Sequence, residues 1–367
     1  MDASKAAQLK AHARAIAQLL YEETETSDPQ QLENFEGIEQ AVRDHFLEHV
    51  GPEIGEFFVK QPSGHRTGRS RTIKSLIGDT QITQAQAQAL GVKGHTRLSP
   101  LLEKCCLLLS ANASYKRAEQ DIEVLTGRRV GHSTQQRLVH RQDLSPTTAQ
   151  QTVKELSVDG GKVRLRTAKG RPCEWRDYKA IKLHQQVIGA SFRDNQTLID
   201  WANQQPLADT VTCLGDGHDG VWNIIAEIGT TTQRREILDW YHLMENLAKV
   251  DSSRDQLIEL EELLWEGKVE TAIARLEDCC DAHAEQFMAY LQKHRPRIVD
   301  YDYYWWIGDS IGSGEIEAGI KQIAARVKLT GAQWNQENVP QVLNHRCAYL
   351  NGAFSLTSAP TMTAVAC

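Results

Sequence analysis

The chain has 367 residues and a formal net charge of −7, with 41% hydrophobic and 7% aromatic residues. This length predicts two or three domains, and the composition is that of a globular protein with enough apolar residues for ordinary cores. Its apolar runs are far shorter than the roughly 20 residues of a membrane span. Residues 1–5 lack the basic start and apolar segment of a signal peptide, so we expect a cytoplasmic protein.

The charge is distributed unevenly along the chain. Residues 1–56 and 242–315 are acidic, whereas residues 60–74 contain no acid and residues 160–182 contain eight bases against Glu174 and Asp177. The bases of the two stretches are Lys60, Arg66, Arg69, Arg71 and Lys74, and then Lys162, Arg164, Arg166, Lys169, Arg171, Arg176, Lys179 and Lys182. Such local surfaces suit phosphate binding even in an acidic chain. The alternative is a solvated basic face that has no partner.

Helical patterns dominate the first 150 residues. Residues 1–60 predict a helical N-terminal segment, and the polar, Gly- and Pro-rich residues 61–70 predict a linker. Within a second helical region at 61–150, residues 115–125 and 132–141 predict two helices joined by a turn that contains Arg128 and Arg129. This outline is typical of a helix-turn-helix unit that binds DNA through these arginines. Simple packing of a helical domain remains the alternative.

From residue 151 the pattern changes to strands. Strands are predicted at 156–166, within 179–191, at 210–214 and at 235–242, with a helix at 195–204. This order predicts an α/β fold, with a ribonuclease-H-like mixed sheet at 151–242. The remaining segments are predicted as an all-α insertion at 243–305, final core helices at 306–350 and a disordered tail at 351–367.

Three acidic residues stand in settings that indicate a shared site. Asp159 and Asp216 each follow an apolar run and precede a glycine, and Glu317 opens a predicted helix 101 residues later. Carboxylates that converge from separate segments are what a two-metal phosphodiester-cleaving site requires. The alternative is turn formation or capping, since Asp-Gly is common in turns. Glu315 lies nearby, but two residues apart on a helix point about 200° apart, so only one of the two glutamates can face the site.

The eight cysteines include no Cys-x-x-Cys pair. A zinc site needs four ligands at suitable spacing, and no such set is visible. We therefore expect reduced and mostly buried thiols.

Several short motifs, taken in their order and spacing, resemble bacterial insertion-sequence transposases of the ISKra4 family and, more loosely, the Mutator-like group. The resemblance covers roughly residues 100–350. The matching pieces are Val158-Asp159-Gly160-Gly161-Lys162-Val163-Arg164, Glu174-Trp175-Arg176, Gly215-Asp216-Gly217, Asp239-Trp240-Tyr241-His242, Gly312-Ser313-Gly314-Glu315-Ile316-Glu317, and Trp334 through Leu343-Asn344 to Arg346.

The resemblance implies a DDE transposase, in which Asp159, Asp216 and Glu317 are catalytic and hold two Mg²⁺ (or Mn²⁺) ions. It favours Glu317 over Glu315, because the family's glutamate follows Gly-Ser-Gly and two further residues. The implied partners are double-stranded DNA, both transposon ends and target, and a second protomer in a homodimer or higher oligomer on DNA. The implied location is the bacterial cytoplasm, in association with the nucleoid.

The resemblance also implies further DNA-contacting residues. Asp239 and His242 resemble an element thought to help position DNA or the active site in Mutator-like enzymes; the alternative is an ordinary strand with a surface histidine. Other candidates are the basic residues after the first aspartate and two tryptophans that either stack on bases or pack in the core, namely Lys162, Arg164, Arg166, Trp222 and Trp334.

Two other functions stay open. One is a catalytically inactive, transposase-derived protein that binds specific DNA sites through its helical N-terminal region. The other is a different ribonuclease-H-like nuclease, such as a resolvase that acts on branched DNA.

Overall fold

A computed structural model describes residues 2–63, 68–94, 96–144, 146–277 and 282–354. The chain forms two compact units, Met1–Leu138 and Val139–Cys367. The boundary lies earlier than the predicted one at 150, because residues 139–150 bond to the second unit. Trp201 Nε1 donates to the carbonyl of Thr147, and Gln341 Nε2 donates to the carbonyl of Val139. The predicted tail at 351–367 and the basic residue Arg66 fall largely or wholly outside the described residues.

The first unit begins with helices, in agreement with the expectation for residues 1–60. They are α1 (Ala3–Ser27), the short turn η1 (Pro29–Glu33), α2 (Phe35–His45), the π-helical turn η2 (Phe46–Val50) and α3 (Gly51–Ser63). Asp2 caps α1 and Asn34 caps α2, each with a side-chain oxygen that accepts a backbone N–H three residues later.

The prediction of a helical region at 61–150 missed two strands. Strands β1 (Ser70–Ser75) and β2 (Gly78–Thr83) pair antiparallel as a hairpin. Each strand has one isoleucine among polar residues, and Ile73 and Ile82 are buried whereas the residues next to them in the chain are exposed or half-buried. The rest of the region is helical, in α4 (Gln84–Ala89), α5 (Pro100–Ser110), α6 (Tyr115–Thr126) and α7 (His132–Arg141).

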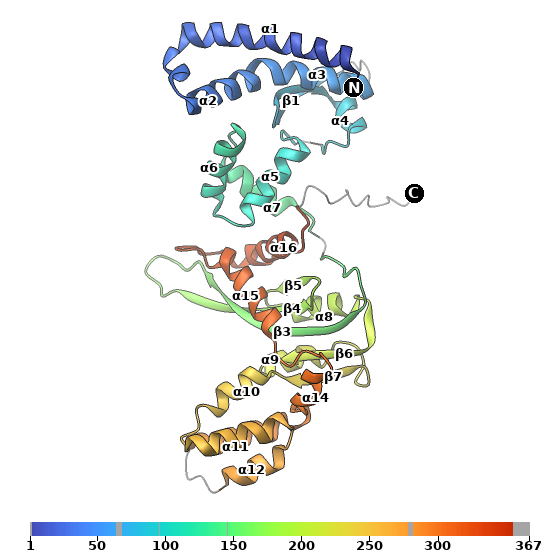
Figure 1. Ribbon diagram of the computed structural model, residues 1–367, viewed down its shortest axis with the longest axis vertical. Helices are drawn as coiled ribbons and strands as arrows, with labels where there is room; N and C mark the ends of the chain where they lie inside the picture. Colours follow the sequence, from blue (N-terminus) through green and yellow to red (C-terminus); the bar gives the residue numbers. More distant parts are fainter. Residues whose placement is uncertain (1, 64–67, 95, 145, 278–281, 355–367) are drawn as a thin grey trace. The chain divides into compact units, whose positions relative to one another are not determined.

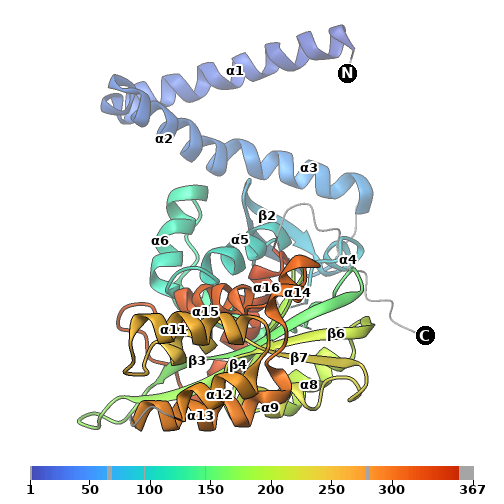
Figure 2. The same cartoon turned by 60° about the horizontal axis from the view of Figure 1, so that its bottom comes forward.

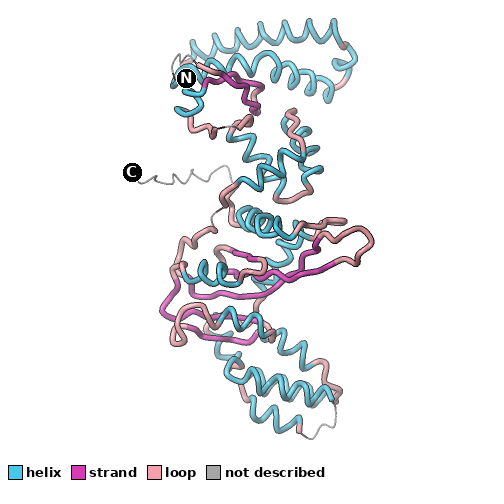
Figure 3. The backbone as a smooth tube through the Cα atoms, turned by 180° about the vertical axis from the view of Figure 1, so that it is seen from behind, coloured by secondary structure: helices cyan, strands magenta, loops and turns pink. Residues whose placement is uncertain are grey.

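The second unit is built on a mixed five-stranded sheet, which confirms the predicted α/β class (Figure 1). Its strands are β3 (Val153–Leu165), β4 (Glu174–Leu183), β5 (Ile188–Ser191), β6 (Leu207–Gly215) and β7 (Arg234–Leu238). They lie in the order β5-β4-β3-β6-β7, antiparallel from β5 to β3 and parallel from β3 to β7. Figure 3 shows the long β3–β4 hairpin extending away from the rest of the sheet.

Helices cover both faces of this sheet. On one face α8 (Asn195–Asn203) and α9 (Asp219–Ile225) pack against Leu156, Val158 and Ile181. On the other, α15 (Gly314–Val327) and α16 (Val339–Leu350) pack against Val163 and Tyr178. From Leu156 onwards, the alternation along β3 thus places even-numbered Leu156 and Val158 in one core and odd-numbered Val163 and Leu165 in the other.

The predicted strand at 235–242 is shorter than expected. It ends at Leu238, and α10 (Trp240–Leu247) follows at once because the Asp239 carboxylate caps that helix. The predicted helical insertion then follows as α11 (Arg254–Trp265), α12 (Val269–Leu276), α13 (Ala282–His294), η3 (Arg295–Arg297) and α14 (Tyr301–Trp306). Tyr301 ties the insertion to the sheet, since its hydroxyl donates to the carbonyl of Leu238 at 2.8 Å.

The described cysteines agree with the expectation of thiols. Cys105, Cys106, Cys173, Cys213 and Cys347 are free, and three of them are buried. Burial raises the pKa of Cys106, Cys213 and Cys347 to about 12. The other three cysteines lie outside the described residues. None of the described helices has the length and apolar character that crossing a membrane demands.

Candidate functional site

Three aspartates occupy equivalent positions relative to three neighbouring strands, Asp159 within β3 and the other two directly after β6 and β7. Val158 of β3 pairs with Gly215 of β6, and Gly215 pairs with Leu238 of β7. The residue that follows each of these three is an aspartate, namely Asp159, Asp216 and Asp239. Because side chains alternate between the faces of a sheet, all three carboxylates belong to the face that α15 covers. The strand register therefore sets Asp159, Asp216 and Asp239 in one row across the sheet.

Asp239 is the most enclosed of the three, with no exposed surface. Its Oδ1 accepts the backbone N–H of His242 at 2.8 Å and so caps α10. Its Oδ2 accepts both the backbone N–H and, at 2.6 Å, the hydroxyl of Ser313. Burial opposes the charged form, but the hydrogen bonds from His242 and Ser313 outweigh it and lower the pKa of Asp239.

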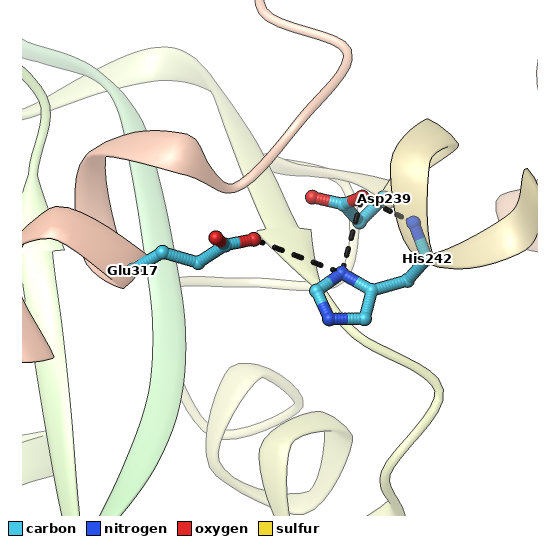
Figure 4. Close-up of side chains that lie close together, drawn as sticks. All are labelled: Asp239, His242 and Glu317. Atoms are coloured by element: carbon cyan, nitrogen blue, oxygen red, sulfur yellow. Dashed lines mark hydrogen bonds and ion pairs between the residues drawn. The ribbon is translucent and has the colours of Figure 1, made fainter. Parts of the chain in front are cut away.

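His242 links this aspartate to the predicted catalytic glutamate (Figure 4). Its Nδ1 lies 3.2 Å from Oδ1 of Asp239 and 3.9 Å from Oε1 of Glu317. The interaction with Asp239 is the largest influence and, despite partial burial, raises the pKa of His242 to about 9. At neutral pH the ring is therefore a cation between two carboxylates. Asp239, His242 and Glu317 form the one group of three potential metal ligands found in the described part of the chain.

The structure separates the two neighbouring glutamates at the start of α15. Glu317 points to His242, with its other oxygen 3.9 Å from Nζ of Lys321. Glu315 instead accepts the backbone N–H of Gln185 at 2.8 Å, in the turn between β4 and β5. Gln185 has a positive φ of 57°, so Glu315 holds a strained turn. Only Glu317 faces the aspartates, as the helical geometry requires.

Asp159 lies beside the group without belonging to it. Burial raises the pKa of Asp159, the N–H of Gly160 opposes this, and the negative charge of Asp216 adds to it. The Asp159 carboxylate accepts its neighbour's N–H at 2.5 Å, and that of Asp216 accepts the N–H of His218 at 2.9 Å. Two carboxylates thus adjoin the Asp239–His242–Glu317 group, and their crowding leaves an excess of negative charge.

The predicted basic residues after Asp159 share the opposite face of β3. Lys162, Arg164 and Arg166 alternate with the buried Val163 and Leu165. Lys162 and Arg166 are exposed, whereas Arg164 is half-buried and bonds to Cys173 across the hairpin. Of these three predicted residues, Lys162 and Arg166 are thus exposed to solvent and Arg164 is held in the hairpin.

The tryptophan candidates are placed in the interior. Trp222 is only 4% exposed, beneath the guanidinium of Arg297 at 4.1 Å, so its ring is not available for a base to stack on. Trp334 is half-buried and donates from Nε1 to the carbonyl of Val327 at 2.9 Å. The placement of Trp222 corrects its assignment as a DNA contact, because the core requires its large apolar ring.

The two arginines of the candidate helix-turn-helix differ in the same way. Arg128 is largely enclosed and pairs with Asp79 on β2, which makes it a structural residue of the first unit and corrects its assignment as a DNA contact. Arg129 is 73% exposed, with Nε 3.3 Å from Glu119. Of the pair, only Arg129 is accessible to a phosphate.

Two contributions to the site had no clear signal in the sequence. Ser313 joins it through Asp239, and the aromatic end of α13 supports the loop after Asp216. A Cβ at Gly217 would collide with the ring of Tyr290, so this glycine permits close packing of the insertion under the loop. Ser313 lies in the Gly-Ser-Gly motif, but the motif alone does not indicate its contact with Asp239.

Comparison with protein-family models and with curated protein sequences finds no match for this chain.

Proposed function

We propose that the protein is a DDE transposase, which binds the ends of its mobile element and performs metal-dependent DNA cleavage and strand transfer. The observation that carries this proposal is the alignment of Asp159, Asp216 and Asp239 in the register of three adjacent strands, on the sheet face that the helix bearing Glu317 covers. These three aspartates and Glu317 come from four separate segments of the chain, and phosphodiester chemistry with two metal ions requires carboxylates that converge from such segments.

The topology of the sheet supports the same proposal. Three antiparallel strands followed by two parallel ones, in the order β5-β4-β3-β6-β7, match the arrangement expected of a ribonuclease-H-like core. In that arrangement the first aspartate lies on the central strand β3 and the second directly after its parallel neighbour β6, which is where Asp159 and Asp216 lie.

The donor set fits divalent cations with a preference for oxygen. Asp159, Asp216 and Glu317 would hold Mg²⁺ or Mn²⁺ through carboxylate oxygens. The raised pKa of Asp159, due first to burial and also to the charge of Asp216, indicates a site where added positive charge is favourable. When bound, such ions would activate the attacking hydroxyl and stabilise the leaving oxygen.

The protein's own residues have separable roles in this proposal. Asp239 fixes the start of α15 through Ser313, and the protonated ring of His242 keeps Glu317 on the side of the aspartates. The exposed cations Lys162 and Arg166 lie on the other face of the β3–β4 hairpin, where they would contact a stretch of the DNA backbone away from the carboxylates.

The test uses labelled DNA that carries the ends of the element, with Mg²⁺ or with EDTA. We expect cleavage at the 3′ ends that requires Mg²⁺ and disappears in Asp216→Asn. Asp209→Asn is a matched control, because Asp209 is an exposed residue of the same strand. Binding without cleavage by the wild type would instead indicate the inactive DNA-binding protein, and cleavage without strand joining would indicate a nuclease of the resolvase type.

A further inference from the structure

One motif of the sequence, Glu174-Trp175-Arg176, has no part in the carboxylate site. The carboxylate of Glu174 pairs with the guanidinium of Arg176, whereas the indole of Trp175 is 49% exposed. Trp201 and Trp222, by contrast, are 6% and 4% exposed. A single exposed aromatic ring needs no explanation by itself, so the residues around Trp175 decide whether it is a binding group.

Trp175 shares one face of the β3–β4 hairpin with three basic residues. It pairs directly with Arg164 of β3 in the antiparallel ladder. Side chains of directly paired residues, and of residues two places along either strand, stand on the same side of a sheet. The face therefore contains Trp175, Arg164, the diagonal neighbours Lys162 and Arg166, and Asp177. We call these five residues the tryptophan face.

The protein leaves the tryptophan face uncovered. On this side of the sheet, the described helices α8 and α9 pack against Leu156, Val158 and Ile181, nearer the start of β3. The opposite side of the hairpin is core, where Val163 and Tyr178 are buried. Figure 2 shows the tip of the hairpin reaching past the other strands of the sheet. One side of the hairpin is thus packed and the other is open to solvent.

The open face is positively charged around the ring. Its three bases stand against one acid, Asp177, and within the described residues neither of the exposed side chains Lys162 and Arg166 takes part in an ion pair. These two lie four residues apart on β3, or about 13 Å, with Trp175 on the neighbouring strand between them. Basic residues that follow a phosphate backbone, with an aromatic ring for the base, are the components of single-strand binding surfaces.

We propose that the tryptophan face binds a single strand of DNA. An unpaired base stacks on the indole of Trp175, and the phosphates on either side of that base contact Lys162 and Arg166. A duplex does not suit this face, because its bases are stacked on one another and offer no free ring surface. Only the choice of DNA over RNA rests on the proposed function; the charge and the exposed ring are independent of it.

The bound strand would lie at a defined distance from the carboxylates. Arg164, opposite Trp175, is five residues from Asp159 along β3, or about 17 Å, and its side chain is on the other face. A strand held there would be kept apart from its complement close to the place of cleavage. The resemblance to transposases implies cationic contacts with double-stranded DNA in this region, and it assigns no role to Trp175.

Two other tryptophans are more exposed but lie in different surroundings. Trp305 and Trp306 of α14 are 65% and 79% exposed. They stand between Asp302 and Asp309 in the acidic part of the chain, residues 242–315, where negative charge repels phosphates. Exposure alone therefore does not select a ring that binds bases, and Trp306 provides a matched control.

Fluorescence anisotropy tests the stacking, with a labelled single strand of mixed sequence and, separately, its duplex, both in EDTA. Trp175→Ala should weaken binding of the strand at least tenfold, as expected for the loss of one base stacked on an aromatic ring. The same variant should change duplex binding less than twofold. Trp175→Phe keeps a ring and should stay within about threefold of the wild type. Trp306→Ala should bind the strand as the wild type does.

The salt dependence separates stacking from charge. Trp175→Ala should leave the slope of log K against log salt unchanged, because stacking releases no counterions. Lys162→Gln with Arg166→Gln should lower the slope by about 0.7 for each phosphate contact that is lost on a single strand. Unchanged strand affinity in Trp175→Ala, or an equal loss on the duplex or in Trp175→Phe, would overturn the proposal. A protein that binds the strand in this way but never cuts DNA would refute the transposase and leave the stacking intact.

Photocrosslinking locates the bound base directly. A strand that carries 5-iodouracil, irradiated in the complex, forms a covalent bond to an aromatic ring in contact with the base. Mass spectrometry of the digested complex should find that bond at Trp175. Crosslinks confined to Trp305 or Trp306 would place the strand on α14 and refute the tryptophan face as its binding site.

Discussion

The Asp239 carboxylate accepts hydrogen bonds from both the backbone N–H and the hydroxyl of Ser313, across 74 residues of sequence. It thereby joins the end of β7 to the turn from which α15 begins. Since α15 carries Glu317, a single buried side chain fixes where the last carboxylate of the candidate site lies relative to the sheet.

Removal of this connection should be costly. Asp239→Ala leaves the N–H groups of His242 and Ser313 without their acceptor in a buried place. We expect the free energy of unfolding to fall by about 2–4 kcal/mol, measured by urea titration. Asp300→Ala is the matched control, because Asp300 caps α14 in the same way but is exposed, and about 1 kcal/mol is expected. Equal losses in the two variants would show that the Ser313 contact adds nothing.

The two glutamates of α15 should differ in function. Glu317→Gln removes a charge from the group beside the aspartates and should reduce Mg²⁺-dependent cleavage at least a hundredfold, with stability nearly unchanged. Glu315→Gln keeps an oxygen that can accept the N–H of Gln185, so cleavage should change less than threefold. Initial cleavage rates on the same DNA distinguish the two. A larger loss of cleavage in Glu315→Gln than in Glu317→Gln would show that Glu315, and not Glu317, acts at the metal site.

Glu155 should make stability depend on pH in the acid range. Burial opposes its ionisation, but hydrogen bonds from His184 and Ser310 outweigh burial and lower the pKa of Glu155 to about 2, from 4.5. A carboxyl group whose pKa is lower in the folded than in the unfolded state stabilises the folded state at pH values above the unfolded pKa. This stabilisation is lost as the pH falls from about 4.5 to 2. The unfolding free energy of the wild type should therefore exceed that of Glu155→Gln by about 2 kcal/mol at pH 6.

The difference in unfolding free energy between the wild type and Glu155→Gln should shrink steadily below pH 4.5. Because the wild type and Glu155→Gln are compared at the same pH, the contributions of the other carboxylates to the unfolding free energy cancel. Glu174→Gln, at a more exposed carboxyl, should show no such trend. A difference that stays constant down to pH 2.5 would mean that the charge of Glu155 is not what stabilises the fold.

The basic residues at the hairpin end of β3 should raise the affinity for DNA of any base sequence. The variant with Lys162→Gln and Arg166→Gln removes two exposed cations at the hairpin end of β3 and should weaken binding about tenfold at 100 mM salt. The slope of log K against log salt should fall by about 0.9 for each phosphate that the variant no longer neutralises. Fluorescence anisotropy on matched and unrelated duplexes measures both effects.

Lys154→Gln is the control for that experiment. Lys154 is also exposed on β3 but stands at its opposite end, away from the hairpin. It should leave the affinity and the salt slope unchanged. An equal loss in both variants would indicate a diffuse electrostatic effect of net charge.

Local patterns predicted much of the secondary structure. The strands around Asp159 and Asp216, the helix after residue 195 and the two helices of 115–141 follow from apolar spacing and caps within short windows. The β1–β2 hairpin was missed because its two strands are only six residues each and polar on their outer faces. The predicted strand at 235–242 was too long because Asp239 acts as a helix cap. The apolar residues on both sides of Asp239 made the segment look like a continuous strand.

The sequence by itself determined much of the alternation of strands and helices, and that only one of Glu315 and Glu317 can face the site, because each depends on residues close together in the chain. Only the tertiary structure decided which carboxylates meet. The pairing of Gly215 with both Val158 and Leu238 brings Asp239 into the row. Contacts across 74 and 75 residues join Asp239 to Ser313 and His242 to Glu317. Such pairings depend on strand register and on the packing of α15, and no short window of sequence specifies either.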